Sequence, residues 1–165
     1  MLESGGFFIA GGLGEYDPRR NHHTGVLQHA AVAVGSHTLT LANVHGIAEW
    51  PKTDTPERLE QSKKIEEFLQ SAPGPQVLCG DFNLSPTTES IALFARAGLR
   101  NMIQKFNIST TRSDIERELF KDQVGRDLIS DYIFVSDAIE PAALSVPEVE
   151  DSDHLPLLFT FSIAK

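Results

Sequence analysis

The hydrophobic pattern first indicates strands at residues 26–34 and 37–45, which a Gly-Ser pair separates. Two strand-like segments joined by two turn residues are typical of a β-hairpin. Because successive side chains of a strand point to opposite faces, Asn43 and His45 share one face at the end of the second segment. The pattern therefore predicts a hairpin whose second strand ends in polar side chains.

Helical periodicity follows in two places, residues 53–70 and residues 86–98. The first segment has Pro56 in its opening turn after a capping residue, either Asp54 or Thr55. Its apolar stripe consists of Leu59, Ile65, Phe68 and Leu69. The second segment presents Ile91, Phe94 and Ala95 inward and ends at Gly98. Two amphipathic helices are predicted.

Between the helices, residues 76–86 (QVLCGDFNLSP) begin as a buried strand and then turn polar. Alternation places Asp81 and Asn83 on one face at the carboxyl end of this strand and turns Phe82 into packing. Gly80 leaves room for a group to approach the backbone. An Asx turn after glycine explains the acid and the amide as well as a catalytic role does, so both interpretations stand at this point.

The C-terminal half predicts strong strands at residues 131–136 and 155–163, with a weaker strand at 142–149. Residues 105–126 have mixed charge and no clean period, which indicates a long loop with one helical turn near 113–120. Strands and helices in this mixed order favour a layered α/β sandwich over a purely parallel sheet.

A length of 165 residues suits one domain. Residues 1–25 are dense in glycine, proline, asparagine and histidine, and we expect an irregular N-terminal arm there, followed by a folded portion over residues 26–165. No apolar stretch reaches the roughly 18 residues of a membrane span. The N-terminus lacks the basic leading region of a signal peptide, so a cytoplasmic location is the default expectation.

The net charge of −9 argues against a protein held on nucleic acid by a general basic field. It does not exclude a nucleic-acid substrate, because bound divalent cations supply positive charge locally. The single cysteine, Cys79, lies in an apolar run and is expected to be a small buried residue without redox chemistry.

Polar side chains mark the ends of four predicted strands. Taken singly, His45 suits a hydrogen-bonded structural histidine, Asp131 an exposed acid at a strand start, and the pair Asp153-His154 a polar turn. Four such ends together indicate a catalytic rim, since rigid strands deliver side chains to one edge of a sheet.

The segments NVHG (43–46), GDFN (80–83), DYIFVS (131–136) and SDHLPL (152–157), in this order, resemble motifs of the endonuclease/exonuclease/phosphatase superfamily. The resemblance implies a deoxyribonuclease-like α/β sandwich. It also implies metal-dependent hydrolysis of a phosphodiester or a phosphomonoester by in-line attack of water. Nucleic acid, a phospholipid head group and a small phosphate ester remain open as substrates.

Roles carried over from the resemblance begin with His154, which it implies to be the base or the acid partner. Asp131 would bind the imidazole and fix its tautomer. Asp81 would position the attacking water or a metal ion.

The resemblance further implies that Asn83 and His45 bind non-bridging phosphate oxygens, where charge builds in the transition state. Asp153 would contribute to the metal or to groups around it. Mg²⁺ is the expected ion, with Mn²⁺ as an alternative, because carboxylate and water ligands suit it.

The glutamate that is the principal metal ligand of the family has no counterpart in the pattern. Glu3 and Glu15 lie in glycine-rich sequence, and neither is assigned this role. We therefore expect a domain that lacks the N-terminal part of the family fold, and a truncated or inactive domain that binds phosphorylated ligands without turnover is the alternative function. Calcineurin-like metallophosphoesterases are disfavoured because their Asp-x-His and Gly-Asn-His segments are missing. The oligomeric state is open.

Two further features bear on the substrate. The basic residues of the loop between 100 and 126, Arg112 among them, are diluted by acids, which favours a solvated surface of mixed charge. Trp50 follows the His45 strand, where it suits either packing or stacking on a base.

Overall fold

The computed structural model describes residues 1–12, 24–121, 128–149 and 151–164. Its elements in chain order are β1 (Glu3–Ala10), β2 (Gly25–Val34), β3 (His37–His45), α1 (Pro56–Ser71), β4 (Gln76–Asp81), α2 (Glu89–Arg96), β5 (Arg100–Asn101), α3 (Met102–Lys105), α4 (Asp114–Leu119), β6 (Asp131–Val135), β7 (Ile139–Ser145) and β8 (Leu158–Ile163). None of the described helices has the length and apolar composition needed to cross a bilayer.

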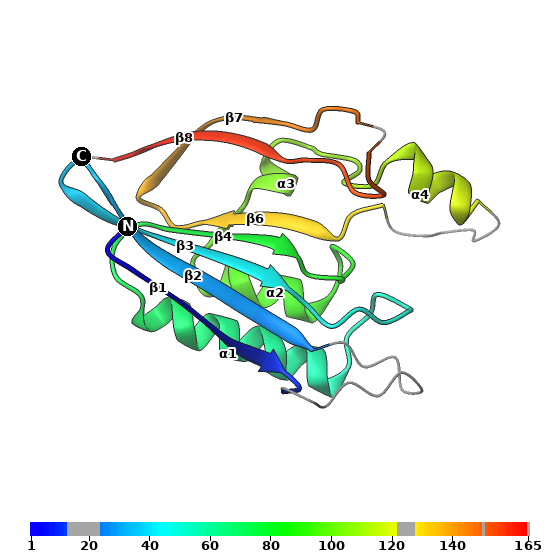
Figure 1. Cartoon of the computed structure of the whole chain (residues 1–165), viewed down its shortest axis with the longest axis horizontal. Coiled ribbons are helices and arrows are strands. Elements are labelled where there is room, and N and C mark those ends of the chain that lie inside the picture. The colour runs from blue at the N-terminus through cyan, green and yellow to red at the C-terminus, as the bar shows by residue number, and fades with distance from the viewer. Residues whose placement is uncertain (13–23, 122–127, 150, 165) are drawn as a thin grey trace.

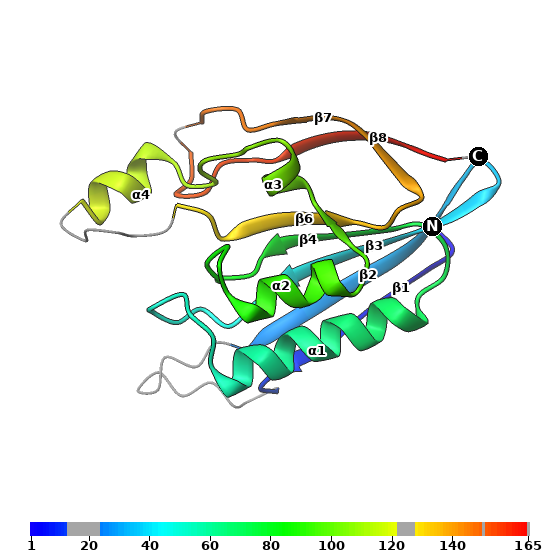
Figure 2. The same ribbon diagram turned by 180° about the vertical axis from the view of Figure 1, so that it is seen from behind.

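One sheet has the strand order β1-β2-β3-β4-β6-β5, and β7 pairs with β8 in a second, two-stranded sheet. Only β3 and β4 run parallel; the other paired strands are antiparallel. Helices α1 and α2 lie against one face of the larger sheet, and β7 and β8 lie over β6 on the opposite side (Figures 1 and 2). The predicted layered α/β architecture is confirmed.

Helix α1 begins where the sequence predicts, because Thr55 caps it and Pro56 occupies its first turn. Its buried face includes Arg58, which is fully buried. The Arg58 guanidinium donates to the backbone carbonyls of Ile47, Glu49, Pro51 and Thr53. One side chain thus fixes the loop that follows β3.

Phe82 lies at the centre of the core between the sheet and the helices. Its ring centroid is 5.5 Å from those of Phe94 and Tyr132 and 5.7 Å from that of Phe134. All four rings are fully buried. The prediction that Phe82 turns away from Asp81 into packing is confirmed, and this packing anchors the segment that carries the polar strand end.

The expected irregular arm over residues 1–25 is wrong for residues 3–10, which form strand β1. This strand pairs antiparallel with β2, and Phe7 packs against Phe68 of α1. Glycines conceal the strand in the sequence, and Gly5 fits because a Cβ there would lie 2.8 Å from the His29 imidazole. The part of the predicted arm that includes Glu15 lies outside the described residues.

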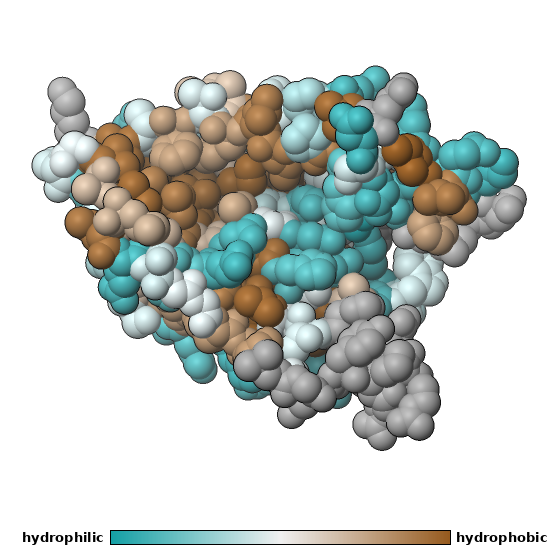
Figure 3. All heavy atoms as spheres, viewed as in Figure 1, coloured by the Kyte–Doolittle hydropathy of each residue, from teal (hydrophilic) through white to brown (hydrophobic). Residues whose placement is uncertain are grey.

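The C-terminal strands are present with shifted bounds: β7 begins three residues before the predicted segment 142–149 and ends at Ser145, and β8 begins three residues after residue 155. The long loop contains the six-residue helix α4 at the place of the predicted turn, and β7 corresponds to the weaker predicted strand. Strand β8 buries side chains such as Phe159 and Phe161 against a second apolar cluster that includes Val77 and Ile133. Figure 3 shows apolar side chains gathered over β7 and β8, whereas polar side chains gather toward the strand ends on the right.

Replacing Phe82 with alanine is expected to lower the free energy of unfolding by about 3–5 kcal/mol, because a fully buried ring leaves a cavity among three aromatic neighbours. Urea denaturation followed by circular dichroism measures this. Leu119→Ala, at a position that is 68% exposed, is the matched control and should change stability by less than about 0.5 kcal/mol. A loss below about 1 kcal/mol in Phe82→Ala would contradict the central role of this ring.

Candidate active site

Three strand ends place polar residues side by side at one edge of the sheet. His45 is the register partner of Asp81, and Asp81 is the partner of Asp131. The parallel strands β3 and β4 end at this edge, and the antiparallel strand β6 begins there. The three residues therefore form one row across the sheet, as the sequence predicts for a catalytic rim.

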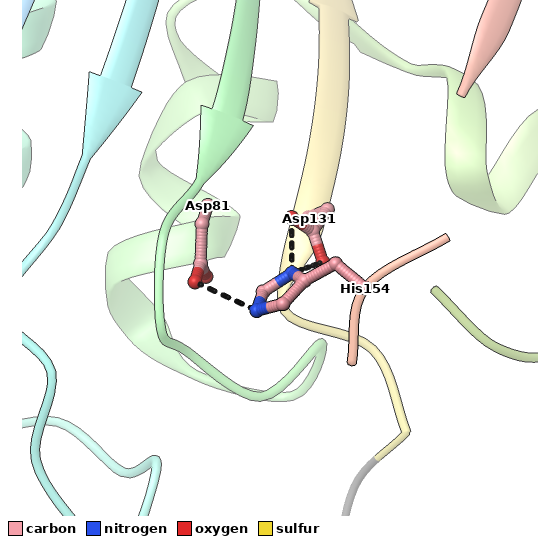
Figure 4. A group of neighbouring side chains, drawn as sticks. All are labelled: Asp81, Asp131 and His154. Atoms are coloured by element: carbon pink, nitrogen blue, oxygen red, sulfur yellow. Dashed lines mark hydrogen bonds and ion pairs between the residues drawn. The ribbon is translucent and has the colours of Figure 1, made fainter. Parts of the chain in front are cut away.

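His154 enters this row from the segment that precedes β8 (Figure 4). Its Nδ1 lies 3.0 Å from both carboxylate oxygens of Asp131, and its Nε2 lies 3.6 Å from Oδ2 of Asp81. One ligand atom from each of Asp81, Asp131 and His154 lies within 4.8 Å of the others. Residues that are far apart in sequence thus form a compact Asp-His-Asp cluster.

The Asp131 carboxylate is held by further hydrogen bonds. Its Oδ2 accepts from Thr111 Oγ1 at 2.7 Å and from Ser130 Oγ at 3.1 Å. Burial opposes ionisation of Asp131, but His154, Thr111 and the charge of Arg112 outweigh it, and the pKa of Asp131 is lowered. Asp131 is therefore held as a carboxylate.

The pKa of His154 moves in the other direction. Burial lowers it, but the hydrogen bond and the charge of Asp131 act more strongly together, and the pKa is raised above its ordinary value. Arg112 opposes this rise and Asp81 adds to it. The imidazole therefore binds a proton more tightly than a free histidine does.

Both interpretations of Asp81 describe part of its geometry. One oxygen, Oδ1, accepts from the backbone N–H of Asn83 at 2.9 Å, which is an Asx turn, while Oδ2 faces His154. At the preceding residue only glycine fits, since the φ of Gly80 is 127° and a Cβ there would lie 2.0 Å from the Val44 carbonyl oxygen. The group that approaches the backbone at Gly80 is thus the neighbouring strand.

The other predicted site residues differ in placement. Asn83 is buried and has a φ of 54°. Its side-chain amide donates to the Gly46 carbonyl at 3.4 Å, which ties Asn83 to the loop after β3. His45 is exposed at the end of the row. Asp153 is exposed, and its Oδ2 lies 3.8 Å from His154 Nε2.

Arg112 joins the site although the sequence predicts it on a solvated loop, and that prediction is wrong for this residue, which is only 4% exposed. Its Nη1 contacts His154 Nε2, and its Nη2 donates to Ser130 Oγ at 2.6 Å. Backbone hydrogen bonds on both sides hold Arg112 in this buried position: the Thr111 N–H donates to the Leu128 carbonyl, and the Ser113 N–H donates to the Asp153 carbonyl. No local signal in the mixed-charge segment distinguishes Arg112, because long-range pairing buries it.

The cluster has the donor chemistry of a divalent-cation site. Carboxylate oxygens of two aspartates and an imidazole nitrogen converge within 4.8 Å, and hard divalent cations prefer such oxygen ligands. Glu116 is buried near Arg112 but does not belong to this group of ligand atoms. Within the described residues, no glutamate takes the position of a metal ligand in the cluster.

The fold is similar to those of several solved structures. A mannosyl-6-phosphatase of Bacteroides thetaiotaomicron superposes with a TM-score of 0.69 at 19% identity, covering 98% of this chain and 66% of that one. TDP2 of D. rerio in complex with a single-strand DNA product gives 0.66 at 18% identity, covering 98% and 67%. The human Nocturnin catalytic domain with bound sulfate gives 0.62 at 20% identity, covering 99% and 59%. The chain spans about two thirds of the length of these structures, or less.

Comparison of the sequence with known proteins and protein families identifies the family of this chain. None of the curated proteins compared is significantly similar to the chain in sequence. The model of the Endonuclease/Exonuclease/phosphatase family matches residues 6–154, which include residues 6–10 of β1 and every residue of the Asp-His-Asp cluster. The chain belongs to the Endonuclease/Exonuclease/phosphatase family.

Proposed function

We propose that the protein hydrolyses a phosphate ester by in-line attack of water, assisted by a divalent cation. The observation that carries this proposal is the placement of His154, whose Nδ1 is bound to Asp131 while Nε2 faces Asp81. Membership in the family supports phosphoester hydrolysis as the reaction class. Mg²⁺ suits the carboxylate ligands best, and Mn²⁺ is the alternative.

His154 transfers the proton in this proposal. When its Nδ1–H donates to the Asp131 carboxylate, Nε2 is left with the lone pair that accepts a proton from water. Asp131 orients the ring and stabilises the imidazolium that forms. Because the pKa of His154 is raised from a value already near neutrality, the same ring can return the proton to the leaving group.

Asp81 and Asp153 are the residues that would hold the cation, since the Oδ2 atoms of both lie on the Nε2 side of the imidazole. A bound divalent cation would neutralise charge on the phosphoryl oxygens. His45, exposed beside Asp81 in the same row, is proposed to donate to a non-bridging oxygen. Asn83 is also proposed to donate to a non-bridging oxygen, with the side-chain amide hydrogen that is not bonded to the Gly46 carbonyl.

The substrate class remains a proposal at the level of phosphate esters. The named activity of one structural neighbour is that of a phosphatase, and another neighbour contains a DNA product. The net charge of −9 disfavours extended binding along nucleic acid without cations. We therefore propose a compact phosphoryl group as the element that the site recognises.

Binding of phosphorylated ligands without turnover is the second candidate function. It is favoured by the composition of the cluster, in which the described residues supply aspartates and a histidine but no glutamate. Binding of inorganic phosphate, measured by calorimetry, without any hydrolysis of either ester class would favour this alternative.

His154→Ala is expected to reduce metal-dependent hydrolysis by about 10²–10⁴-fold, because the proton-transfer group is removed. Release of p-nitrophenol from bis(p-nitrophenyl) phosphate and from p-nitrophenyl phosphate, each with Mg²⁺ or with EDTA, measures this and compares diester with monoester. His37→Ala, at the opposite end of β3, is the matched control and should retain activity. Turnover that survives both His154→Ala and chelation would exclude this mechanism.

Asp131→Asn is expected to lower the pKa of His154, because the charge and the hydrogen bond that raise it are weakened. A pH titration of the His154 ring resonances by NMR measures the change. Asp137→Asn is the matched control, since Asp137 is exposed and pairs with Arg100 away from the cluster. An unchanged His154 pKa in Asp131→Asn would contradict the proposed role of this pair.

The loss of stability caused by Asp131→Asn is expected to depend on pH. Because the folded-state pKa of His154 is raised, its contribution is fully present below the unfolded value of about 6.5 and is lost as pH rises through the folded-state pKa. The lowered pKa of Asp131 gives a contribution that is lost as pH falls through the folded-state pKa of Asp131. Asp131→Asn should therefore cost more stability at about pH 5.5 than at about pH 9.

A further inference from the structure

Arg112 occupies the space among the acidic groups of the active site. Its Nη2 lies 3.7 Å from Asp81 Oδ2, and its Nη1 lies 3.6 Å from Asp153 Oδ2. The same Nη1 contacts Nε2 of His154. These are the atoms to which the proposed function assigns the cation and the proton transfer.

The charges around Arg112 favour neutralisation of the neighbouring carboxylates by its guanidinium over binding of an anionic ligand. Asp81, Asp153 and Glu116 each place a carboxylate oxygen within 3.8 Å of its guanidinium. One buried guanidinium is thus surrounded by more negative charge than it neutralises. A phosphate group approaching this cluster would meet net negative charge unless a cation came with it.

Arg112 and a divalent cation have the same electrostatic task at this position. The guanidinium forms ion pairs with oxygen atoms that would otherwise coordinate the metal, and two cations a few ångströms apart repel each other. We propose that Arg112 is an internal competitor of the catalytic cation: it neutralises Asp81 and Asp153 when no metal is bound, and its side chain moves off them when the metal binds. This inference rests on the metal site of the proposed function.

The proposed movement involves the Arg112 side chain alone, because its backbone is fixed. The backbone bonds of Thr111 and Ser113 to neighbouring segments hold the chain on both sides of it. Glu116, one helical turn further along at i+4, lies 3.8 Å from Nη1. Glu116 is not among the grouped ligand atoms, so the existing Arg112–Glu116 ion pair does not involve an atom assigned to the metal.

The test is binding of Mn²⁺ in the absence of substrate, measured by the electron paramagnetic resonance signal of free Mn²⁺ at constant pH and ionic strength. Arg112→Gln should bind Mn²⁺ about fivefold or more tightly than the wild type, because the competing cation is gone. Arg117→Gln is the matched control: it also removes one positive charge, but from an exposed side chain that pairs with Asp114 on α4. Its affinity should stay within about twofold of the wild type.

Equal or weaker Mn²⁺ binding by folded Arg112→Gln would overturn the inference. The inference would also be overturned if the gain in Mn²⁺ affinity persisted in the double variant Arg112→Gln/Asp81→Asn, since the ion would then bind elsewhere. Should Arg112→Gln fail to fold, the double variant Arg112→Gln/Glu116→Gln removes one charge of each sign and serves in its place. The rise in melting temperature on adding Mn²⁺ should be larger in whichever of these variants folds than in the wild type.

Failure of this inference and failure of the proposed function give different results. Metal-dependent hydrolysis by the wild type together with unchanged Mn²⁺ affinity in Arg112→Gln refutes only the competition. Tighter Mn²⁺ binding in Arg112→Gln that requires Asp81, without hydrolysis of any ester by the wild type, supports the competition and refutes the enzymatic function.

Discussion

The register of three neighbouring strands is the constraint on which the site depends. Parallel pairing of β3 with β4 and antiparallel pairing of β4 with β6 align His45, Asp81 and Asp131 in one row. A shift of one residue in either pairing would send these side chains to the helix-covered face. The Phe82 aromatic cluster and Gly80, which lets the Val44 carbonyl come close, hold the middle strand in this register.

A buried polar segment completes the site from the other side. Thr111, Arg112 and Ser113 are each less than 5% exposed, and all three take part in hydrogen bonds. Burying polar groups is unfavourable unless they are paired, and here their partners include Asp131 and Ser130. The segment thereby joins the start of β6 to the loop of His154.

Two side chains of α1 hold the loop after β3. Arg58 binds four of its carbonyls, and Gln61 accepts from the N–H of Ile47 at 2.9 Å. Both side chains project from α1 and are fully buried. Trp50 on this loop is 55% exposed, so it lies outside the buried core.

The sequence by itself determined the strands and helices with clear periodicity, the polar strand ends at His45, Asp81 and Asp131, and the motif that contains His154. These features are local, because alternation, caps and turn residues act over a few positions. Only the tertiary structure decided that glycine-rich residues 3–10 form β1, that the Asn83 amide binds the Gly46 carbonyl, and that Arg112 lies among the acids. Each of these depends on pairing with a segment distant in the chain, and no local pattern encodes which distant backbone will supply the partner.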